Sequence, residues 1–172
     1  MTRPVTLIEP GTVKLERLLP GPVERVWAYI IESDKRAKWL AAGEFDLRVG
    51  GKVRLEFDNS KLSCDETAPE KYKGRERHSF EGVITRLEPL RALAHTWTWN
   101  GGNTEVTYEL TPRGKEVLFT IVHRRLGSDL VPSVMGGWDV HTGILADVLA
   151  GKEPRPFWST HSKLEREYAA AL

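Results

Sequence analysis

Several features are scarce in this sequence, and each absence narrows the class of protein. Cys64 is the one cysteine, so no disulfide can form within the chain, and a reducing, cytoplasmic setting is favoured. The 25 Lys and Arg residues nearly balance the 24 Asp and Glu residues, and the net charge of +1 gives no field that would attract nucleic acid or an anionic membrane. No apolar run approaches the ~20 residues of a membrane span, and the start MTRPVTLIEPG lacks the apolar core of a signal peptide. We therefore expect a cytoplasmic protein with neither a nucleic-acid nor a membrane partner.

The 172 residues suit a single domain, which can bury roughly 70% of its unfolded surface without help from a disulfide or a metal. Aromatic residues are the unusual part of the composition, because six tryptophans stand against two methionines. They are Trp27, Trp39, Trp97, Trp99, Trp138 and Trp158. Most fall on faces that the periodicity marks as buried, which predicts one shared interior.

Alternation of apolar and polar residues predicts a run of strands with one buried face each. The clear stretches are 13–19, 53–57, 93–99, 106–110 and 117–123, and a less regular one covers 78–87. Turn signals separate them at Gly50-Gly51, at 100–103 and at 111–114. Short connections of this kind indicate an antiparallel sheet.

Helical spacing appears three times. Val23, Val26, Trp27 and Ile30 form one stripe of a short helix. A long helix is predicted between a cap at Ser128 or Asp129 and a stop at Gly151. Its stripe consists of Val131, Val134, Trp138, His141, Leu145 and Val148. A tail helix over about 157–170, with Phe157, His161, Leu164 and Tyr168, either folds back on its own domain or pairs with a second copy in a homodimer.

This order predicts an α+β fold in one domain, 1–172, with a core at about 12–151. A curved antiparallel sheet of six to seven strands wraps around the long C-terminal helix, because that arrangement buries both apolar faces and leaves a space between them. The segment 59–77 is charged and lacks periodicity, so it is a long loop of the kind that is often functional or disordered.

Several short elements also carry a resemblance to a known family. They are Val26-Trp27-Ala28, Trp39, Arg48-Val49-Gly50-Gly51-Lys52 and Gly137-Trp138-Asp139-Val140-His141. Over about 12–151 the chain resembles the START-like (SRPBCC) superfamily, in the branch related to the C-terminal domain of the activator of heat-shock-protein-90 ATPase. The resemblance implies a helix-grip fold, in which a seven-stranded sheet grips a long helix around an apolar cavity. Members of this kind bind hydrophobic small molecules, and a minority act as cyclases or aromatase-like enzymes.

His141 is the most informative position, because it lies on the apolar stripe of the long helix and faces the sheet. It is either a core histidine with one bonded ring nitrogen, or a cavity residue that contacts a ligand or transfers a proton. His123 and His95 lie on aromatic faces of two strands and could point into the same space. Their spacing matches no compact metal-ligand pattern, so we expect no metal. His78 and His161 are assigned no role.

The candidate ligand-binding residues are Trp39, Phe57, His95, Trp97, Trp99, Tyr108, Phe119, His123, Trp138 and His141. Rings on strand faces are often plain core, yet six tryptophans must share one interior. Trp39 is expected at the mouth of the cavity. Glu81 shares its predicted strand side with Val83 and Leu87, and it is either a solvated carboxylate or an inward acid or base.

Three functions follow as alternatives. The first is binding of a small hydrophobic, aromatic-containing molecule without a cofactor. The second is a cyclase-like or dehydratase-like enzyme that uses His141, His123 and Glu81 as general acids and bases. The third is a protein-interaction or co-chaperone-like module that uses the 59–77 loop and the tail. The third is the least favoured, since the heat-shock activator has a separate N-terminal domain and about ten residues precede the first strand here.

Overall fold

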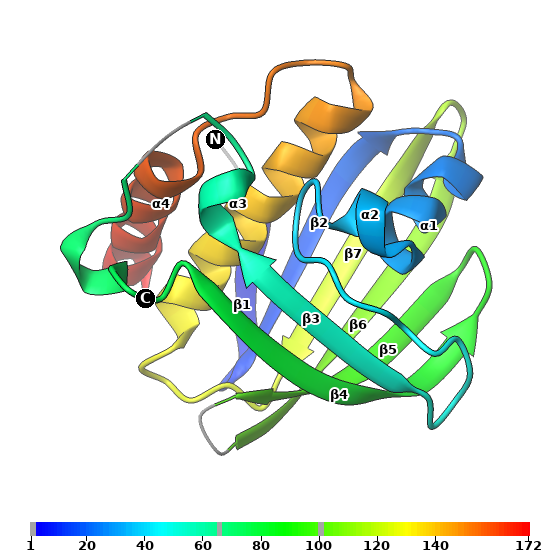
Figure 1. Cartoon of the computed structure of the whole chain (residues 1–172), viewed down its shortest axis with the longest axis horizontal. Helices are drawn as coiled ribbons and strands as arrows, with labels where there is room; N and C mark the ends of the chain where they lie inside the picture. Colours follow the sequence, from blue (N-terminus) through cyan, green and yellow to red (C-terminus); the bar gives the residue numbers. More distant parts are fainter. Residues whose placement is uncertain (1–2, 65–66, 100–101) are drawn as a thin grey trace.

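Seven strands form one antiparallel sheet that curves around a long helix (Figure 1). The structure is a computed structural model that describes residues 3–64, 67–99 and 102–172. The strands are β1 (Val5–Glu9), β2 (Thr12–Pro20), β3 (Lys52–Asp58), β4 (Arg77–Glu88), β5 (Ala92–Trp99), β6 (Gly102–Arg113) and β7 (Glu116–Arg124). The helices are α1 (Val23–Ile31), α2 (Ser33–Arg36), α3 (Val131–Leu149) and α4 (Phe157–Ala171), with short 3₁₀ turns η1 (Asn59–Lys61) and η2 (Glu70–Tyr72). The strand order is β1-β2-β7-β6-β5-β4-β3.

The predicted α+β helix-grip class is confirmed, and so are the six predicted strands. The seventh strand, β1, was not predicted. It lies at a sheet edge, and Val5 is its one buried residue, so the segment carries no alternating pattern. An edge strand that is exposed along most of its length leaves no periodic signal in the sequence.

Two predicted boundaries are wrong. The long helix begins at Val131 with Leu130 at the N-cap position, so neither Ser128 nor Asp129 caps it. Its first turn contains Pro132. Proline lacks a backbone N–H, but the N–H groups of the first turn have no acceptor within the helix, so no hydrogen bond is lost there. The predicted turn at 111–114 is also too early, because Pro112 lies inside β6 opposite Val117. Strand β5 begins at Ala92, opposite Glu109, so it does not extend to Pro112. Pro112 therefore has a neighbouring strand on one side only, and a missing N–H is tolerated at such a position.

Helix α3 lies in the concave face of the sheet and is buried on nearly every side. The sheet covers one side, and α4 packs along another (Figure 1). The two helices approach closely at Gly136, where a Cβ atom would lie 3.1 Å from the backbone nitrogen of Glu165. The tail helix therefore folds back on its own domain, as one of the two predicted arrangements requires.

A buried polar cluster fastens α4 and β2 to α3. The Asp139 carboxylate accepts hydrogen bonds from Arg17 of β2 at 2.8 Å and from the Tyr168 hydroxyl of α4 at 2.7 Å. Arg17 also donates to the Thr142 hydroxyl at 3.0 Å. Each oxygen of the carboxylate thus has a partner, which satisfies a charge that would be costly to bury alone.

The described parts of the 59–77 loop, residues 59–64 and 67–77, contain short helical turns that its sequence did not predict. It contains η1 and η2 and runs beside α4 (Figure 1). The Tyr72 hydroxyl hydrogen-bonds to the Glu165 carboxylate and the Ser133 hydroxyl, both at 3.0 Å, and its ring lies 5.6 Å from that of Trp158. The loop and α4 therefore form one wall of the domain.

Helices α1 and α2 cover one end of the sheet, and a buried arginine holds them in place. Arg36 donates to the backbone carbonyls of Ile30, Ala41 and Gly43, and its guanidinium lies 3.7 Å from the ring centre of Phe45. Burial lowers the pKa of Arg36 to about 10, so it is still protonated at neutral pH. No pattern in the sequence indicates this role for Arg36.

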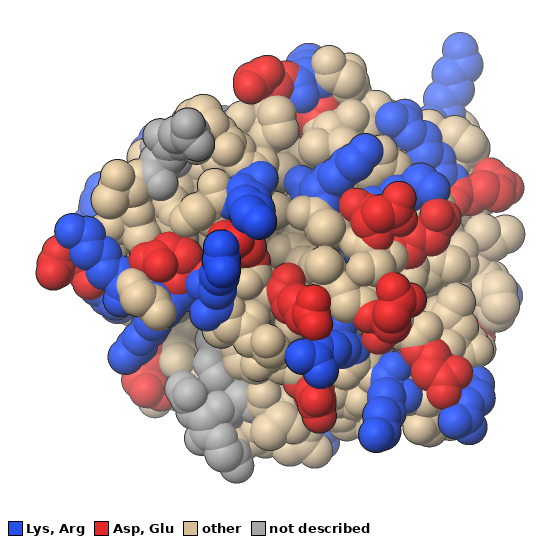
Figure 2. Space-filling view, viewed as in Figure 1, with Lys and Arg blue, Asp and Glu red and all other residues tan. Residues whose placement is uncertain are grey.

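Five tryptophans, Trp27, Trp39, Trp97, Trp138 and Trp158, belong to one buried hydrophobic cluster, which confirms a shared interior for them. The side chain of Trp99 lies outside the described part of the chain. On the outside, acidic and basic side chains are interspersed over the face in Figure 2. Within the described residues, no helix has the length and apolar character needed to cross a membrane.

Candidate functional site

A cavity of about 600 Å³ lies between the β3–β5 part of the sheet, helix α3, and the wall made by the loop and α4. Its apolar lining consists of Leu40, Phe57, Phe80, Trp97, Leu130, Val134, Gly137, Trp138, Phe157 and Trp158. Its polar lining includes His78, His123, His141 and His161, with Asn59, Tyr72 and Ser133. Lys71, Arg75, Arg77, Asp129 and Glu165 add charges to the lining. The volume falls within the usual ~300–1,000 Å³ of small-molecule sites.

Aromatic rings from the sheet and α3 make most of the inner surface. The Trp97 ring lies 5.3 Å from Phe80, 5.7 Å from Phe57 and 5.9 Å from Trp138, measured between ring centres. The Trp138 ring is nearly perpendicular to that of Trp97, at 87°. Such edge-to-face contacts are a favoured arrangement for aromatic pairs, and they hold the rings around the cavity in fixed orientations.

The structure divides the predicted site residues into two groups. Phe57, Trp97, His123, Trp138 and His141 line the cavity. Trp39, His95, Tyr108 and Phe119 are buried elsewhere in the core. The prediction that Trp39 forms the mouth is wrong: it is 0% exposed, its indole N–H donates to the Tyr29 carbonyl at 2.8 Å, and its ring contacts Phe119. Its neighbour Leu40 lines the cavity instead.

His95 is a core histidine. Its Nδ1 donates to the Thr96 carbonyl at 2.9 Å, so Nε2 carries the lone pair and accepts a hydrogen bond from the Tyr108 hydroxyl at 3.0 Å. Burial lowers the pKa of His95 to about 4 and raises the pKa of Tyr108. With both nitrogens bonded inside the protein, the pair is structural.

His123 lines the cavity, yet both of its nitrogens are also used. The Trp138 indole N–H donates to Nδ1 at 3.1 Å, and Nε2 therefore carries the proton and donates to the Thr104 hydroxyl at 2.9 Å. Thr104 in turn donates to the Trp97 carbonyl at 2.8 Å. Burial lowers the pKa of His123 to about 3. This chain of hydrogen bonds leaves His123 no free nitrogen for the predicted acid–base role.

His141 differs from these two histidines. Its Nδ1 donates to the Trp39 carbonyl at 2.7 Å, so the lone pair is on Nε2. Among the residues that the structure describes, Nε2 has no hydrogen-bond partner, and it is not among the side-chain atoms that are sealed from solvent. Burial lowers the pKa of His141 to about 4, so the ring is neutral at neutral pH. It therefore offers an acceptor to the cavity.

Two further histidines line the cavity, although the sequence analysis assigned them no role. His161 of α4 donates from Nε2 to the Ser133 carbonyl at 3.1 Å and stacks on Phe157, with ring planes 6° apart. His78 of β4 stacks on Phe57, with ring centres 5.0 Å apart. The position of His161 on the apolar stripe of the tail helix was a usable signal. No such signal marked His78, because it lies near the start of a strand with irregular alternation.

The prediction that Glu81 could face inward as an acid or base is wrong. Its side chain is 78% exposed and lies 3.8 Å from Arg54 on the outer face of the sheet. A bulge between Ile84 and Arg86 shifts the alternation of β4, so Glu81 and Leu87 do not share a face. The bulge also explains why Val83 is 41% exposed.

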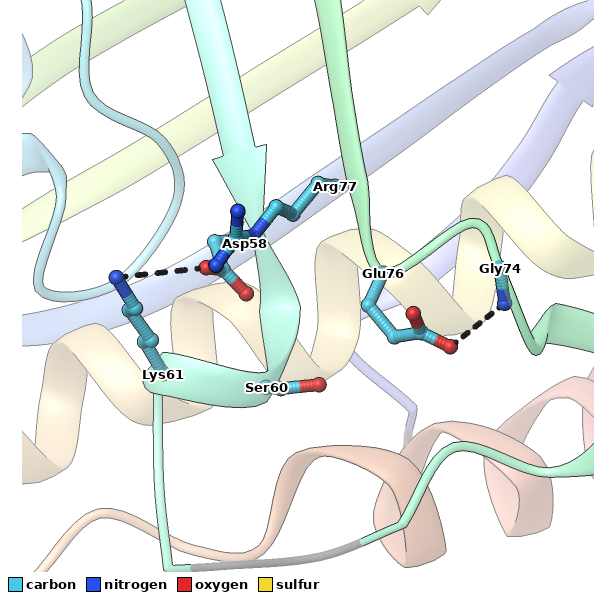
Figure 3. Close-up of a pocket in the computed structure, with 6 residues that line it drawn as sticks. All are labelled: Asp58, Ser60, Lys61, Gly74, Glu76 and Arg77. Carbon is cyan, nitrogen blue, oxygen red and sulfur yellow. Dashed lines mark hydrogen bonds and ion pairs between the residues drawn. The ribbon is translucent and has the colours of Figure 1, made fainter.

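Charged residues gather at the rim of the cavity. A shallow depression of about 420 Å³ adjoins it and is lined by Asp58, Ser60, Lys61, Gly74, Glu76 and Arg77 (Figure 3). Asp58 pairs with Arg77 at 3.3 Å and with Lys61 at 3.6 Å, and the two basic side chains are largely exposed while Asp58 is partly buried. In the described part of the chain, no three His, Cys, Asp or Glu side chains are placed to hold a metal ion.

The gripped helix, the curved sheet and the aromatic cavity together define a helix-grip protein of the START-like class. The sequence model of the family described as "Activator of Hsp90 ATPase homolog 1-like protein" matches residues 20–150, and the chain belongs to that family. The protein encoded by BPP1335 of Bordetella parapertussis is 37% identical, with a TM-score of 0.81 over 97% of this chain and 89% of that one.

More distant solved structures share the fold. CalU16 from Micromonospora echinospora is 20% identical, with a TM-score of 0.68 over 92% of this chain and 86% of that one. CV1439 from Chromobacterium violaceum is 23% identical, with a TM-score of 0.64 over 82% of this chain and 98% of that one. A comparison with curated proteins gave no match.

Proposed function

We propose that this protein binds a small, hydrophobic, aromatic-containing molecule in the cavity between the sheet, α3 and α4, without a covalent cofactor. The observation that carries the proposal is a cavity of about 600 Å³ lined by several aromatic rings and by His141, whose Nε2 acceptor has no partner among the described residues. An apolar pocket with few convergent polar groups is the usual form of a small-molecule site. The family resemblance supports the same function.

The contacts give the enzyme alternative less support. A cyclase or dehydratase needs two groups that exchange protons within reach of one substrate. Of the three predicted catalytic residues, Glu81 lies on the outer face, and His123 has both nitrogens bonded within the protein. Of these three predicted residues, only His141 keeps an unbonded ring nitrogen at the cavity among the described contacts, and one such nitrogen suffices for an anchor.

The interaction-module alternative also has less support. It relies on the 59–77 loop and the tail helix as free surfaces. Tyr72 of the loop is bonded to Glu165 of α4, and Gly136 brings α4 close against α3. Tyr72 of the loop and the α3-facing side of α4 are therefore occupied by contacts within the domain.

Gly137 offers a direct test of the proposal. It lies on α3 at the cavity surface, and a Cβ atom there would meet nothing within 4 Å. Gly137→Leu should therefore place a side chain in the cavity without a clash and improve the helix propensity of the position. Lys163→Leu is the matched control, because it adds the same side chain on the exposed face of α4.

The assay is fluorescence titration with the neutral probe 1-N-phenylnaphthylamine, alongside native mass spectrometry of protein purified from its own host. We expect the unchanged chain and Lys163→Leu to bind the probe, and Gly137→Leu to lose at least about 90% of that binding while keeping its circular dichroism spectrum. The proposal would be refuted if native mass spectrometry shows the mass of the protein without a bound molecule and the unchanged chain also fails to bind the probe. Equal binding by Gly137→Leu would place the ligand outside this cavity.

A further inference from the structure

Three neutral hydrogen-bond donors of the cavity wall already have partners within the protein. The Tyr72 hydroxyl donates to Glu165 at 3.0 Å, and the indole N–H of Trp138 donates to His123. The indole N–H of Trp158 points to the Ser60 hydroxyl at 3.4 Å. A ligand that accepted a hydrogen bond from one of these three groups would have to displace its partner within the protein.

The histidines of the wall leave acceptors unused. His141, His161 and His78 each bond one ring nitrogen to a backbone carbonyl, those of Trp39, Ser133 and Arg75 respectively. A carbonyl oxygen can only accept, so the bonded nitrogen carries the proton in each ring. The other nitrogen of each neutral ring then has a lone pair and no hydrogen.

These lone pairs have no protein partner among the described residues. His161 Nδ1 is sealed from solvent and unpaired, and so is the amide oxygen Oδ1 of Asn59, another residue of the cavity lining. His141 Nε2 and His78 Nε2 are unpaired but reachable. A ligand that brings a donor supplies the partner that these atoms lack, whereas a ligand with acceptors alone leaves them desolvated and unpaired.

His141 is the best placed of these acceptors. It lies between two rings, with Phe57 6.0 Å away and Phe157 5.0 Å away between ring centres. A donor that reaches Nε2 must therefore belong to a group that also packs against aromatic faces. A hydroxyl attached directly to an aromatic ring meets both requirements.

We propose that the ligand is a hydroxyaromatic molecule, which donates its phenolic hydroxyl to His141 Nε2 while its rings pack against Phe57 and Phe157. This inference deepens the proposed ligand-binding function and rests on it. An aromatic carboxylate fits the wall less well. Two of the three cations in the lining, Lys71 and Arg77, already pair with acidic side chains, those of Glu165 at 2.7 Å and Asp58 at 3.3 Å, and Arg75 is the third.

The test compares three probes of one shape by isothermal titration calorimetry with the full chain at pH 7.5. They are 2-naphthol, its methyl ether 2-methoxynaphthalene, and 2-naphthoate. We expect 2-naphthol to bind at least about tenfold more tightly than either of the other two, because a site built to pair a hydroxyl rejects analogues that lack it. His141→Phe keeps an aromatic ring at the position, so it should reduce 2-naphthol to the affinity of the methyl ether.

A second measurement does not depend on the folding of the variant. Long-range ¹H–¹⁵N correlation spectra of the labelled, unchanged chain should show a shift of His141 Nε2 with 2-naphthol and a smaller shift with the methyl ether. Equal affinity for the alcohol and the ether, an unmoved Nε2 resonance, or tighter binding of 2-naphthoate would overturn the hydroxyl assignment and leave ligand binding intact. Failure of all three probes to bind would overturn the assignment together with the proposed function.

Discussion

Three buried neutral histidines should make this fold sensitive to mild acid. Burial lowers the pKa of His95 and His141 to about 4 and that of His123 to about 3, from an ordinary value of 6.5. Between pH 6.5 and about 4 the unfolded chain therefore binds protons that the folded chain does not. Because stability rises with pH wherever the unfolded state binds more protons, it must fall as the pH drops through this window. Above about pH 7.5 these groups contribute no further change, because the unfolded histidines are then neutral as well.

The size of the expected loss of stability follows from the difference between the histidine pKa values in the unfolded and the folded chain. At pH 5 the unfolded value lies 1.5 units above the pH, so each histidine costs about 2 kcal/mol relative to neutral pH. The three together cost about 6 kcal/mol, which is comparable to the whole stability of many domains, about 5–15 kcal/mol. The structure thus predicts a steep loss of stability between pH 6.5 and 5.

The assay is urea unfolding at pH 7.5, 6.0 and 5.0, followed by tryptophan fluorescence and circular dichroism. His95→Gln is the informative variant, because its amide oxygen can still accept from Tyr108 while one titrating group is removed. It should flatten the pH dependence by about one third, whatever its stability at pH 7.5. A free energy of unfolding that stays within about 1 kcal/mol between pH 7.5 and 5.0 would refute the reasoning.

Three other substitutions test single contacts by urea unfolding at neutral pH. Arg36→Met should lower the stability by about 3 kcal/mol or more, since it leaves three buried carbonyls without donors; a loss below about 1 kcal/mol would contradict that role. Gly82→Ala should lower the free energy of unfolding by about 1–3 kcal/mol, because its Cβ would lie 1.8 Å from the Thr96 carbonyl oxygen. Gly137→Ala should leave the free energy of unfolding unchanged or raise it. Equal effects of the two substitutions would show that the backbone at Gly82 relaxes freely. Tyr72→Phe should cost about 1 kcal/mol and should increase proteolysis in the loop; an unchanged cleavage rate would argue that the loop does not depend on this hydroxyl.

The sheet could be predicted because its strands have one buried and one exposed face. The pattern around Val53, Leu55 and Phe57 became β3, and the stripe through Trp138 and His141 became α3. The prediction was wrong where a strand lacks this regular alternation of buried and exposed residues. The strand β1 has no buried alternate face, and the bulge in β4 reverses the alternation, which misplaced Glu81.

The candidate site was less predictable than the fold. Periodicity places His95, His123 and His141 on buried faces, but it cannot tell which of their nitrogens are already bonded. Those partners are set by the folded chain: His141 bonds to the carbonyl of Trp39, 102 residues away in the sequence. Backbone carbonyls are alike in every sequence, so the state of a histidine ring becomes visible with the three-dimensional structure.

Helix α4 forms part of the cavity wall, yet it lies beyond the segment that defines the family. The family match ends at residue 150, and α4 begins at Phe157. Phe157, Trp158 and His161 therefore line the cavity from a helix outside the family match, while α3 and strands β3 to β7 lie within it. The family match alone thus leaves out part of the cavity lining, and any comparison of this cavity between members has to include the terminal helix.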